Sequence, residues 1–169
     1  MTPDALRRLL VRDLEVVGRQ VAAYPKDELL WAELPGRPNT GGTLAVHVAG
    51  NLEHYVGAVL GNTGYSRDRD RELSVRGLTR AEVLAEVDRA AATVSAVLGR
   101  LPAEALDSPY PELLRERRLR TGDFLLHTAM HLAYHLGQLD FHRRQVVPGA
   151  GALPSPSYDV LEASAESPG

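Results

Sequence analysis

Apolar residues recur along the chain at the three- and four-residue spacing of a helix that buries one face. The first such stretch begins at Thr2, a hydroxyl residue placed before a proline that suits the first position of a helix. Its apolar stripe continues to about Tyr24 and consists of Leu6, Leu9, Leu10, Leu14, Val17 and Val21. The pattern predicts a helix over about residues 3–24.

Three further helices are predicted downstream, over about residues 39–61, 79–99 and 121–145. The third helix has the clearest start, because Thr79 and Glu82 have the spacing of a capping box. Its stripe consists of Leu84, Val87, Ala91, Val94 and Leu98. All four predicted helices are long enough to pack side by side along their whole length.

The connecting segments are rich in proline, glycine and charge. KDELLW is predicted to be a short turn-like segment, and NTGYSRDRDRE a polar loop whose charges face solvent. Residues 101–120 contain three prolines and a run of cations, which predicts a long irregular crossover before the last helix. With no alternating strand pattern, we expect an all-α four-helix bundle over residues 1–145, followed by a Pro/Gly/Ser-rich acidic surface tail over 146–169.

Composition narrows the classes of function. The 169 residues suit one domain, and the formal net charge of −3 comes from the acidic tail, since the remainder is neutral. The chain lacks the excess of basic residues that would favour nucleic-acid binding, and no apolar run is long enough to cross a membrane. The N-terminus has no signal-peptide pattern, so we expect a cytoplasmic protein. Because there is no cysteine, any metal must be held by His, Asp or Glu.

The last helix carries most of the histidines, within the segment HTAMHLAYHLGQLDFHRRQ. His131 and His135 lie four residues apart, so they project from one face and can reach one ion. His127 borders the same face without reaching the same ion, and His142 lies too far along the helix. Another helix must therefore supply a third ligand.

The second helix offers candidates for that ligand on one face, namely His47, Asn51 and His54. Three imidazoles would leave a coordination position open, as catalytic zinc sites do. The alternative is that these are ordinary surface or hydrogen-bonded core histidines. The apolar residues around the pair in LLHTAMHLAYHLGQL favour the metal site, because buried unpaired imidazoles are costly.

HLAYHLGQ resembles the His-x-x-x-His-x-Gly-Gln signature of the DinB/YfiT-like superfamily, and HVAGNLEHY and GYSRDRDRE extend the similarity over most of residues 1–145. The resemblance implies an up-down-down-up four-helix bundle, commonly a homodimer, with a three-histidine site for Zn²⁺ or Ni²⁺. Carried over by position, the metal ligands are His47, His131 and His135. A wide apolar stripe on the first helix also suggests the homodimer.

Other polar residues near these motifs are candidates for the pocket. In the family pattern Gly137 allows close helix approach, and Gln138 either orients a ligand or substrate or is a core amide. Asn51 is expected at the mouth of the pocket, and His54 at the surface. Tyr134 either donates a hydrogen bond to substrate or packs as an aromatic side chain. Arg143 and Arg144 end the last helix, where cations favour the helix dipole.

A metal held by three imidazoles can lower the pKa of a bound water or thiol. Relatives of the resembled family include mycothiol-dependent maleylpyruvate isomerases and bacillithiol S-transferases. We therefore expect a metal-dependent enzyme that transfers a low-molecular-weight thiol to small electrophiles, in detoxification or stress response. A metal-dependent hydrolase and a non-enzymatic metal-binding stress-response protein are the alternatives. The sequence selects neither the thiol nor the electrophile.

Overall fold

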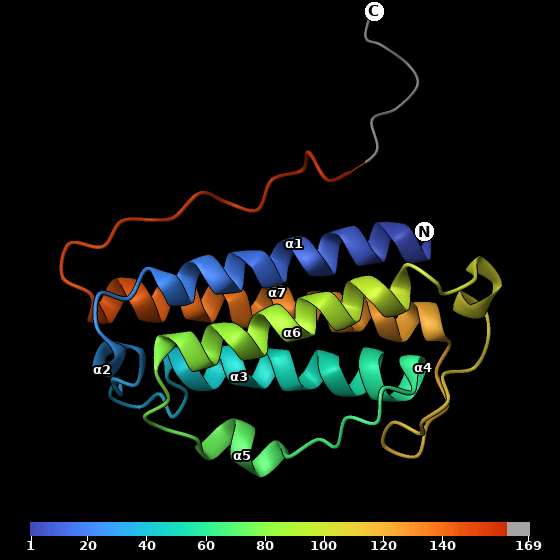
Figure 1. The fold of residues 1–169 in the computed structure, drawn as a ribbon, viewed down its shortest axis with the longest axis horizontal. Coiled ribbons are helices and arrows are strands. Elements are labelled where there is room, and N and C mark those ends of the chain that lie inside the picture. The colour runs from blue at the N-terminus through green and yellow to red at the C-terminus, as the bar shows by residue number, and fades with distance from the viewer. Residues whose placement is uncertain (162–169) are drawn as a thin grey trace, which may run out of the picture.

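The computed structural model describes residues 1–161, and in these residues the regular structure is helical, with only isolated β-bridges in the loops. Four long helical segments lie side by side (Figure 1): α1 (Pro3–Ala22), the continuous run of α3 (Gly41–Leu52), η1 (Glu53–Ala58) and α4 (Val59–Gly61), then α6 (Arg80–Leu98) and α7 (Thr121–Val146). Figure 1 shows α1 and α7 running in one direction, and α3 and α6 in the other.

The helix starts follow from local side-chain chemistry. The Thr2 hydroxyl accepts a hydrogen bond from the Ala5 amide, and Pro3 occupies the first helical position. Thr40 forms a capping box with Thr43 before α3. The capping box of Thr79 with Glu82 before α6 confirms the sequence prediction.

Two predicted connections contain helices. The segment predicted as a turn holds the short α2 (Asp27–Leu30), and the predicted polar loop holds α5 (Arg69–Ser74), which Asp68 caps through a bond from the Arg71 amide. The second long helix also contains a π-helical stretch, η1, that helical periodicity does not reveal. The crossover over 101–120 is irregular as predicted, apart from the 3₁₀ turn η2 (Ala103–Leu106).

The core forms where the four long helices meet, and each of α1 and α3 packs against both α6 and α7. It is built from leucine and valine, and its largest fully buried side chains include Leu10, Leu14, Leu52, Leu98 and Leu132. The stripe of α1 is consumed by this core, because Leu6, Leu10, Leu14, Val17 and Val21 are all buried. Leu9 of the same stripe is half-buried, so α1 leaves little apolar surface for a partner, and the homodimer stays a prediction.

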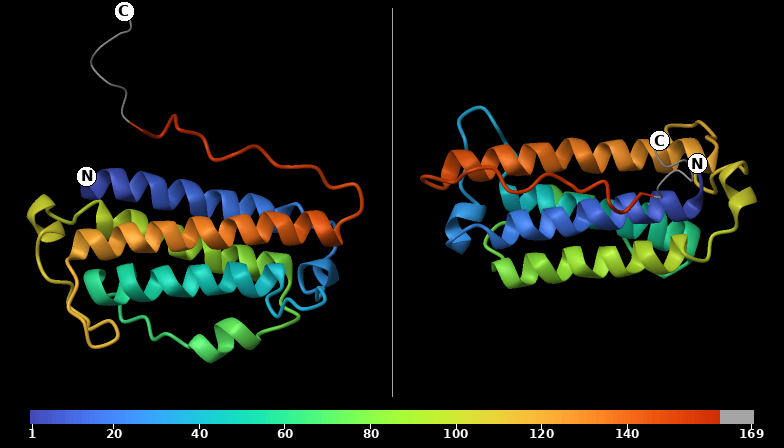
Figure 2. Two further views of the ribbon diagram at one scale, coloured as in Figure 1. Left: turned by 180° about the vertical axis from the view of Figure 1, so that it is seen from behind. Right: turned by 90° about the horizontal axis from the view of Figure 1, so that it is seen from above.

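After α7 the chain turns back across the bundle in an extended conformation (Figure 2). Ser157 accepts a hydrogen bond from Arg12 through its carbonyl, and Gly151 accepts one from Arg143. The predicted acidic tail continues through residues 162–169, which lie outside the described residues.

Within the described part of the chain, no helix combines the length and apolar character required to cross a bilayer.

Candidate metal centre

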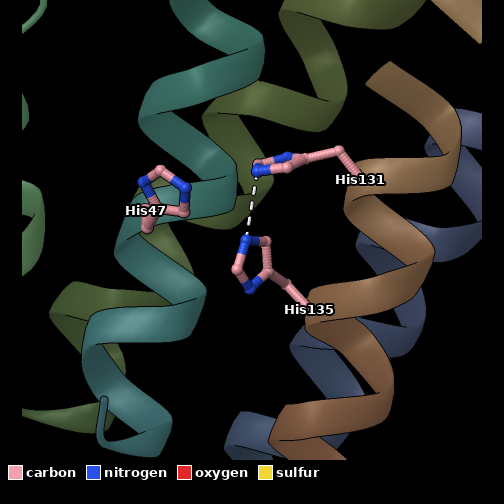
Figure 3. Close-up of side chains that lie close together, drawn as sticks. All are labelled: His47, His131 and His135. Atoms are coloured by element: carbon pink, nitrogen blue, oxygen red, sulfur yellow. Dashed lines mark hydrogen bonds between the residues drawn. The ribbon is translucent and has the colours of Figure 1, made fainter. Parts of the chain in front are cut away.

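His47, His131 and His135 point toward one another from neighbouring helices (Figure 3). His47 projects from α3, and the other two stand one turn apart on α7. A potential ligand atom of each residue lies within 4.8 Å of those of the other two, and no fourth His, Asp or Glu of residues 1–161 joins the group. The rings are close to perpendicular, so that they meet edge to face rather than stacked.

The spacing of the nitrogens suits a small divalent cation. The Nε2 atoms of His131 and His135 are 3.1 Å apart. Zinc–nitrogen bonds of about 2.0–2.1 Å in tetrahedral geometry separate ligand nitrogens by roughly 3.3 Å. Two of the three candidate ligands therefore already lie at the separation that Zn²⁺ or Ni²⁺ requires, and the donor set is the imidazole set that both ions accept.

Gln138 fixes the orientation and tautomer of His135. The Nδ1–H of His135 donates to the Gln138 side-chain oxygen at 2.8 Å, from one turn further along α7. This bond leaves the lone pair of His135 on Nε2, directed toward the other histidines. Of the two alternatives for Gln138, the geometry favours an amide that orients the histidine.

Glu72 fixes the orientation and tautomer of His47, a role that the sequence pattern did not predict. The Nδ1–H of His47 donates to Glu72 at 3.0 Å, which leaves Nε2 free on the side of the α7 histidines. Arg67 in turn donates two hydrogen bonds of 2.8 Å to the same carboxylate. The prediction that the charges of RDRDRE all face solvent is therefore wrong for Glu72, which is only 2% exposed.

Gly50 explains how α5 approaches α3 so closely. A Cβ at Gly50 would lie 2.3 Å from Oε1 of Glu72, a distance that no real side chain tolerates. The glycine in HVAGNLEHY therefore provides the space into which the Glu72 carboxylate is inserted. A glycine on the histidine helix, together with a glutamate in the following loop, was the signal available in the sequence.

Burial keeps His131 and His135 neutral and able to bind a cation. Burial, followed by the neighbouring His135 and His47, lowers the pKa of His131 to about 4. Burial also lowers the pKa of His135, against the opposing effect of its bond to Gln138. For Glu72, burial opposes ionisation, but the bonds from Arg67 and His47 outweigh it and lower the pKa of this carboxyl. The site thus combines two neutral imidazoles on α7 with an ionised carboxylate behind His47.

A cavity of about 740 Å³ opens beside the histidines, and both His47 and His131 line it. Its volume lies within the range of small-molecule sites. Asn51 also lines the cavity, one turn after His47, but at 8% exposed it is buried rather than placed at the mouth. His127 also lines it, but is not among the grouped histidines.

The remaining candidates lie away from the histidine cluster or have structural partners. Tyr134 is 64% exposed, although its ring edge packs against His135. The prediction that Gly137 allows close helix approach is wrong, because nothing lies within 4 Å of the position that a Cβ would occupy there. His54 was expected at the surface, but it is partly buried and forms a hydrogen bond with Glu112. Arg144 pairs with Asp140.

His142 and Arg143 contribute to the packing of α7 rather than to the site. His142 is buried, accepts a hydrogen bond from the Tyr24 hydroxyl and donates to the Ala32 carbonyl. Arg143 is also buried and donates to Gln20 and to Asp140. Arg143 is therefore held by internal partners and is not a surface cation at the helix end.

Comparison with known proteins agrees with this architecture. No curated protein matches the chain significantly. A family model described as the DinB superfamily matches residues 9–139, a range that includes all three clustered histidines together with Glu72 and Gln138. The chain therefore belongs to the DinB superfamily.

Proposed function

We propose that this protein is a divalent-metal-dependent enzyme, with the up-down-down-up bundle of its resembled relatives, that transfers a low-molecular-weight thiol to a small electrophile. The observation that carries the proposal is the open cavity beside the three clustered imidazoles. A structural metal site is usually closed by four protein ligands, whereas a catalytic site keeps a position for substrate. The cavity thus favours an enzyme over a metal-storage or purely structural protein.

His47, His131 and His135 would hold Zn²⁺ or Ni²⁺ through their Nε2 atoms. When bound, such an ion is a Lewis acid that lowers the pKa of a thiol or water at its open position. Glu72 and Gln138 hold the Nδ1–H of two of the histidines, so the lone pairs remain aimed at the shared point. Neutral ligands leave the positive charge of the ion uncompensated, which favours an anionic nucleophile.

The thiol must come from a cosubstrate, because the chain contains no cysteine. The cavity extends from His47 and His131 to the loop before α7, with space for a molecule larger than water. Burial of the histidine side of the cavity reduces competition from bulk water for the reacting atoms. These features support thiol transfer over the alternative of hydrolysis, which needs only a water molecule beside the electrophile.

The experiment is a screen of metal-loaded protein with bacillithiol, mycothiol and glutathione, using 1-chloro-2,4-dinitrobenzene as the electrophile. We expect at least one thiol to be consumed faster than with the metal-free protein or with the His135→Ala variant. No acceleration by protein with a full metal content would contradict thiol transfer. Hydrolysis of an ester substrate without added thiol would instead identify the hydrolase.

We also propose a homodimer, and the observation in its favour is an exposed apolar row on α7. Leu126, Met130 and Tyr134 follow one another at four-residue spacing and are 46%, 66% and 64% exposed, and Phe141 continues the row at 38%. Large apolar side chains in a continuous row on a helix are typical of a contact surface. The dimer would therefore use α7 rather than the first helix.

A further inference from the structure

We propose that the cavity beside the histidines binds a small organic anion, a carboxylate or a phosphate ester with an apolar body, and that Arg115 and Arg117 hold the anionic group. The proposal rests on the proposed function, since it names the substrate class of the same site. It can be tested separately because the arginines belong to a loop that carries none of the clustered histidines.

The charges around the cavity are mostly positive. Four arginines line it, Arg67, Arg69, Arg115 and Arg117, and Glu112 is the acid in the same lining. The Glu112 carboxylate lies 3.0 Å from Nε2 of His54 and forms a hydrogen bond with it. Arg67 is neutralised by Glu72, but in residues 1–161 no carboxylate forms an ion pair with the other three arginines. The free charge at the rim is therefore cationic.

A tight hairpin turn presents two of these arginines. Leu114 and Arg117 exchange both backbone hydrogen bonds, at 2.9 and 3.0 Å. The two residues between them, Arg115 and Glu116, have φ of 48° and 65°, as in the type I′ turns of two-residue hairpins. The turn places Arg115 and Arg117 in the lining of the cavity and leaves the neighbouring Arg118 out of it.

Asn51 offers a further polar contact to a ligand deeper in the cavity. Its side chain is only 8% exposed and lines the cavity, yet its amide forms no hydrogen bond with any described residue. The amide is not sealed from solvent but opens into the cavity, so its donor and acceptor are available to a ligand there. Asn51 stands one turn from His47, so a ligand bonded to it would lie next to the histidines.

The rest of the lining defines the body of the ligand. Tyr55, Leu113, Leu114, Leu119 and Phe124 give the cavity an apolar side, while the arginines stand at its rim. Guanidinium groups bind carboxylates and phosphates in paired hydrogen bonds, which point charges such as lysine do not reproduce. A molecule with an apolar body and one anionic group could therefore bind the arginines with its anionic group and pack its body against the apolar side chains. It could also form a hydrogen bond with the Asn51 amide.

The test uses three small probes of one shape: benzoate, phenyl phosphate and the neutral benzamide, titrated into metal-free protein and followed by NMR. We expect benzoate or phenyl phosphate to bind about tenfold or more tightly than benzamide, because charge-assisted hydrogen bonds carry the recognition. The tighter of the two anions identifies the group that the rim prefers. Added salt should weaken anion binding.

The variants are Arg115→Asn with Arg117→Gln, and Arg118→Gln as the matched control from the same loop. Asparagine tolerates the positive φ of position 115, so the turn survives the change. We expect the double variant to lose anion binding and Arg118→Gln to retain it, with unchanged circular dichroism in both. Equal binding of benzamide and benzoate, or unchanged binding in the double variant, would overturn the proposal.

Metal loading separates this proposal from the proposed function. Anion binding that persists in metal-free protein and depends on the arginines would support the anion site even if no thiol transfer were found. Binding that appears only after Zn²⁺ is added, and that ignores the arginine changes, would mean that the anion binds the ion itself. That result would overturn the arginine site while leaving the metal centre intact.

Discussion

At the scale of single residues, the site depends on hydrogen bonds to the far side of the imidazole rings. His47 and His135 each donate Nδ1–H to a side-chain oxygen, one from Glu72 and one from Gln138. The histidine pair on α7 could be predicted from its four-residue spacing alone. Glu72 was missed, because a glutamate in a stretch of alternating charges normally faces water, and Gly50 on the helix of His47 was the only hint that α5 buries it.

Replacing Glu72 tests the support of His47. The Glu72→Gln change keeps the shape but removes the charge that orders His47 and pairs with Arg67. We expect the affinity for Zn²⁺ to fall by about 10–100-fold, the usual effect of losing such a partner. Calorimetric titration measures the change. The control is Glu86→Gln, since Glu86 pairs with Arg71 away from the histidines. Equal affinities for the two variants would contradict a supporting role for Glu72.

At the scale of elements, the site exists because α5 packs onto α3 at a glycine. The sequence pattern predicted the four long helices and the N-caps Thr2 and Thr79, since periodicity and capping are local properties. It did not predict α5, whose six residues are too few and too polar for periodicity to detect. The π-helical stretch η1 was missed for a similar reason, because one additional residue in a turn leaves no mark on a short apolar pattern.

Gly50→Ala tests this contact. In a helix interior alanine is ordinarily favoured over glycine by about 1 kcal/mol. Here the new Cβ would lie 2.3 Å from the Glu72 carboxylate, so the carboxylate must move away from His47. We expect no gain in the free energy of unfolding and a weaker affinity for Zn²⁺, measured by urea denaturation and metal titration.

Gly137→Ala is the matched control, because Gly137 lies within α7 and has nothing within 4 Å of its Cβ position. We expect this variant to be stabilised by about 0.5–1 kcal/mol, with unchanged metal affinity. If Gly50→Ala stabilised the protein as much as Gly137→Ala, the close contact of α3 with α5 would be refuted.

At the scale of the whole molecule, the bundle places the histidine helices next to each other and leaves a cavity at their side. The spacing of apolar residues predicted the helices, and the resemblance of HLAYHLGQ and HVAGNLEHY selected which histidines should meet. The cavity and its arginines could not be predicted. They depend on how the irregular crossover folds against the bundle, and long connections of this kind have no periodic pattern to interpret.

Buried histidines also make the stability of the bundle sensitive to acid. Burial lowers the pKa of His142 below its usual 6.5, so the folded chain keeps this ring neutral while the unfolded chain protonates it. Below about pH 6.5 the unfolded state then binds more protons, and stability falls as the pH falls toward the folded-state pKa. The stabilising contribution of the neutral ring is fully present above pH 6.5.

The His142→Gln variant removes this titration while keeping an acceptor for Tyr24 and a donor for Ala32. Urea denaturation of metal-free protein between pH 7 and pH 5 should therefore show a smaller loss of stability for the variant than for the wild type. The other histidines are the same in both proteins, so the difference belongs to His142. Parallel pH profiles would show that His142 does not contribute to acid sensitivity.

The assembly prediction concerns the apolar row on α7. Light scattering at micromolar concentration should give twice the chain mass of 18.4 kDa. Met130→Glu places a charge in the middle of the row, where the side chain is 66% exposed, and should give the mass of a single chain without loss of helical content. A wild type that is monomeric at this concentration would contradict the homodimer.

The central claim is that three histidines from two helices hold one divalent ion. It is tested most directly by the metal content of purified wild type and His131→Ala after loading with Zn²⁺ or Ni²⁺ and removal of the excess. Because the core is built from apolar stripes rather than around the metal, circular dichroism should show the same helical content in both proteins. We predict one ion per chain in the wild type and almost none in the variant. A full metal content in His131→Ala, or a wild type that retains neither ion, would contradict the account.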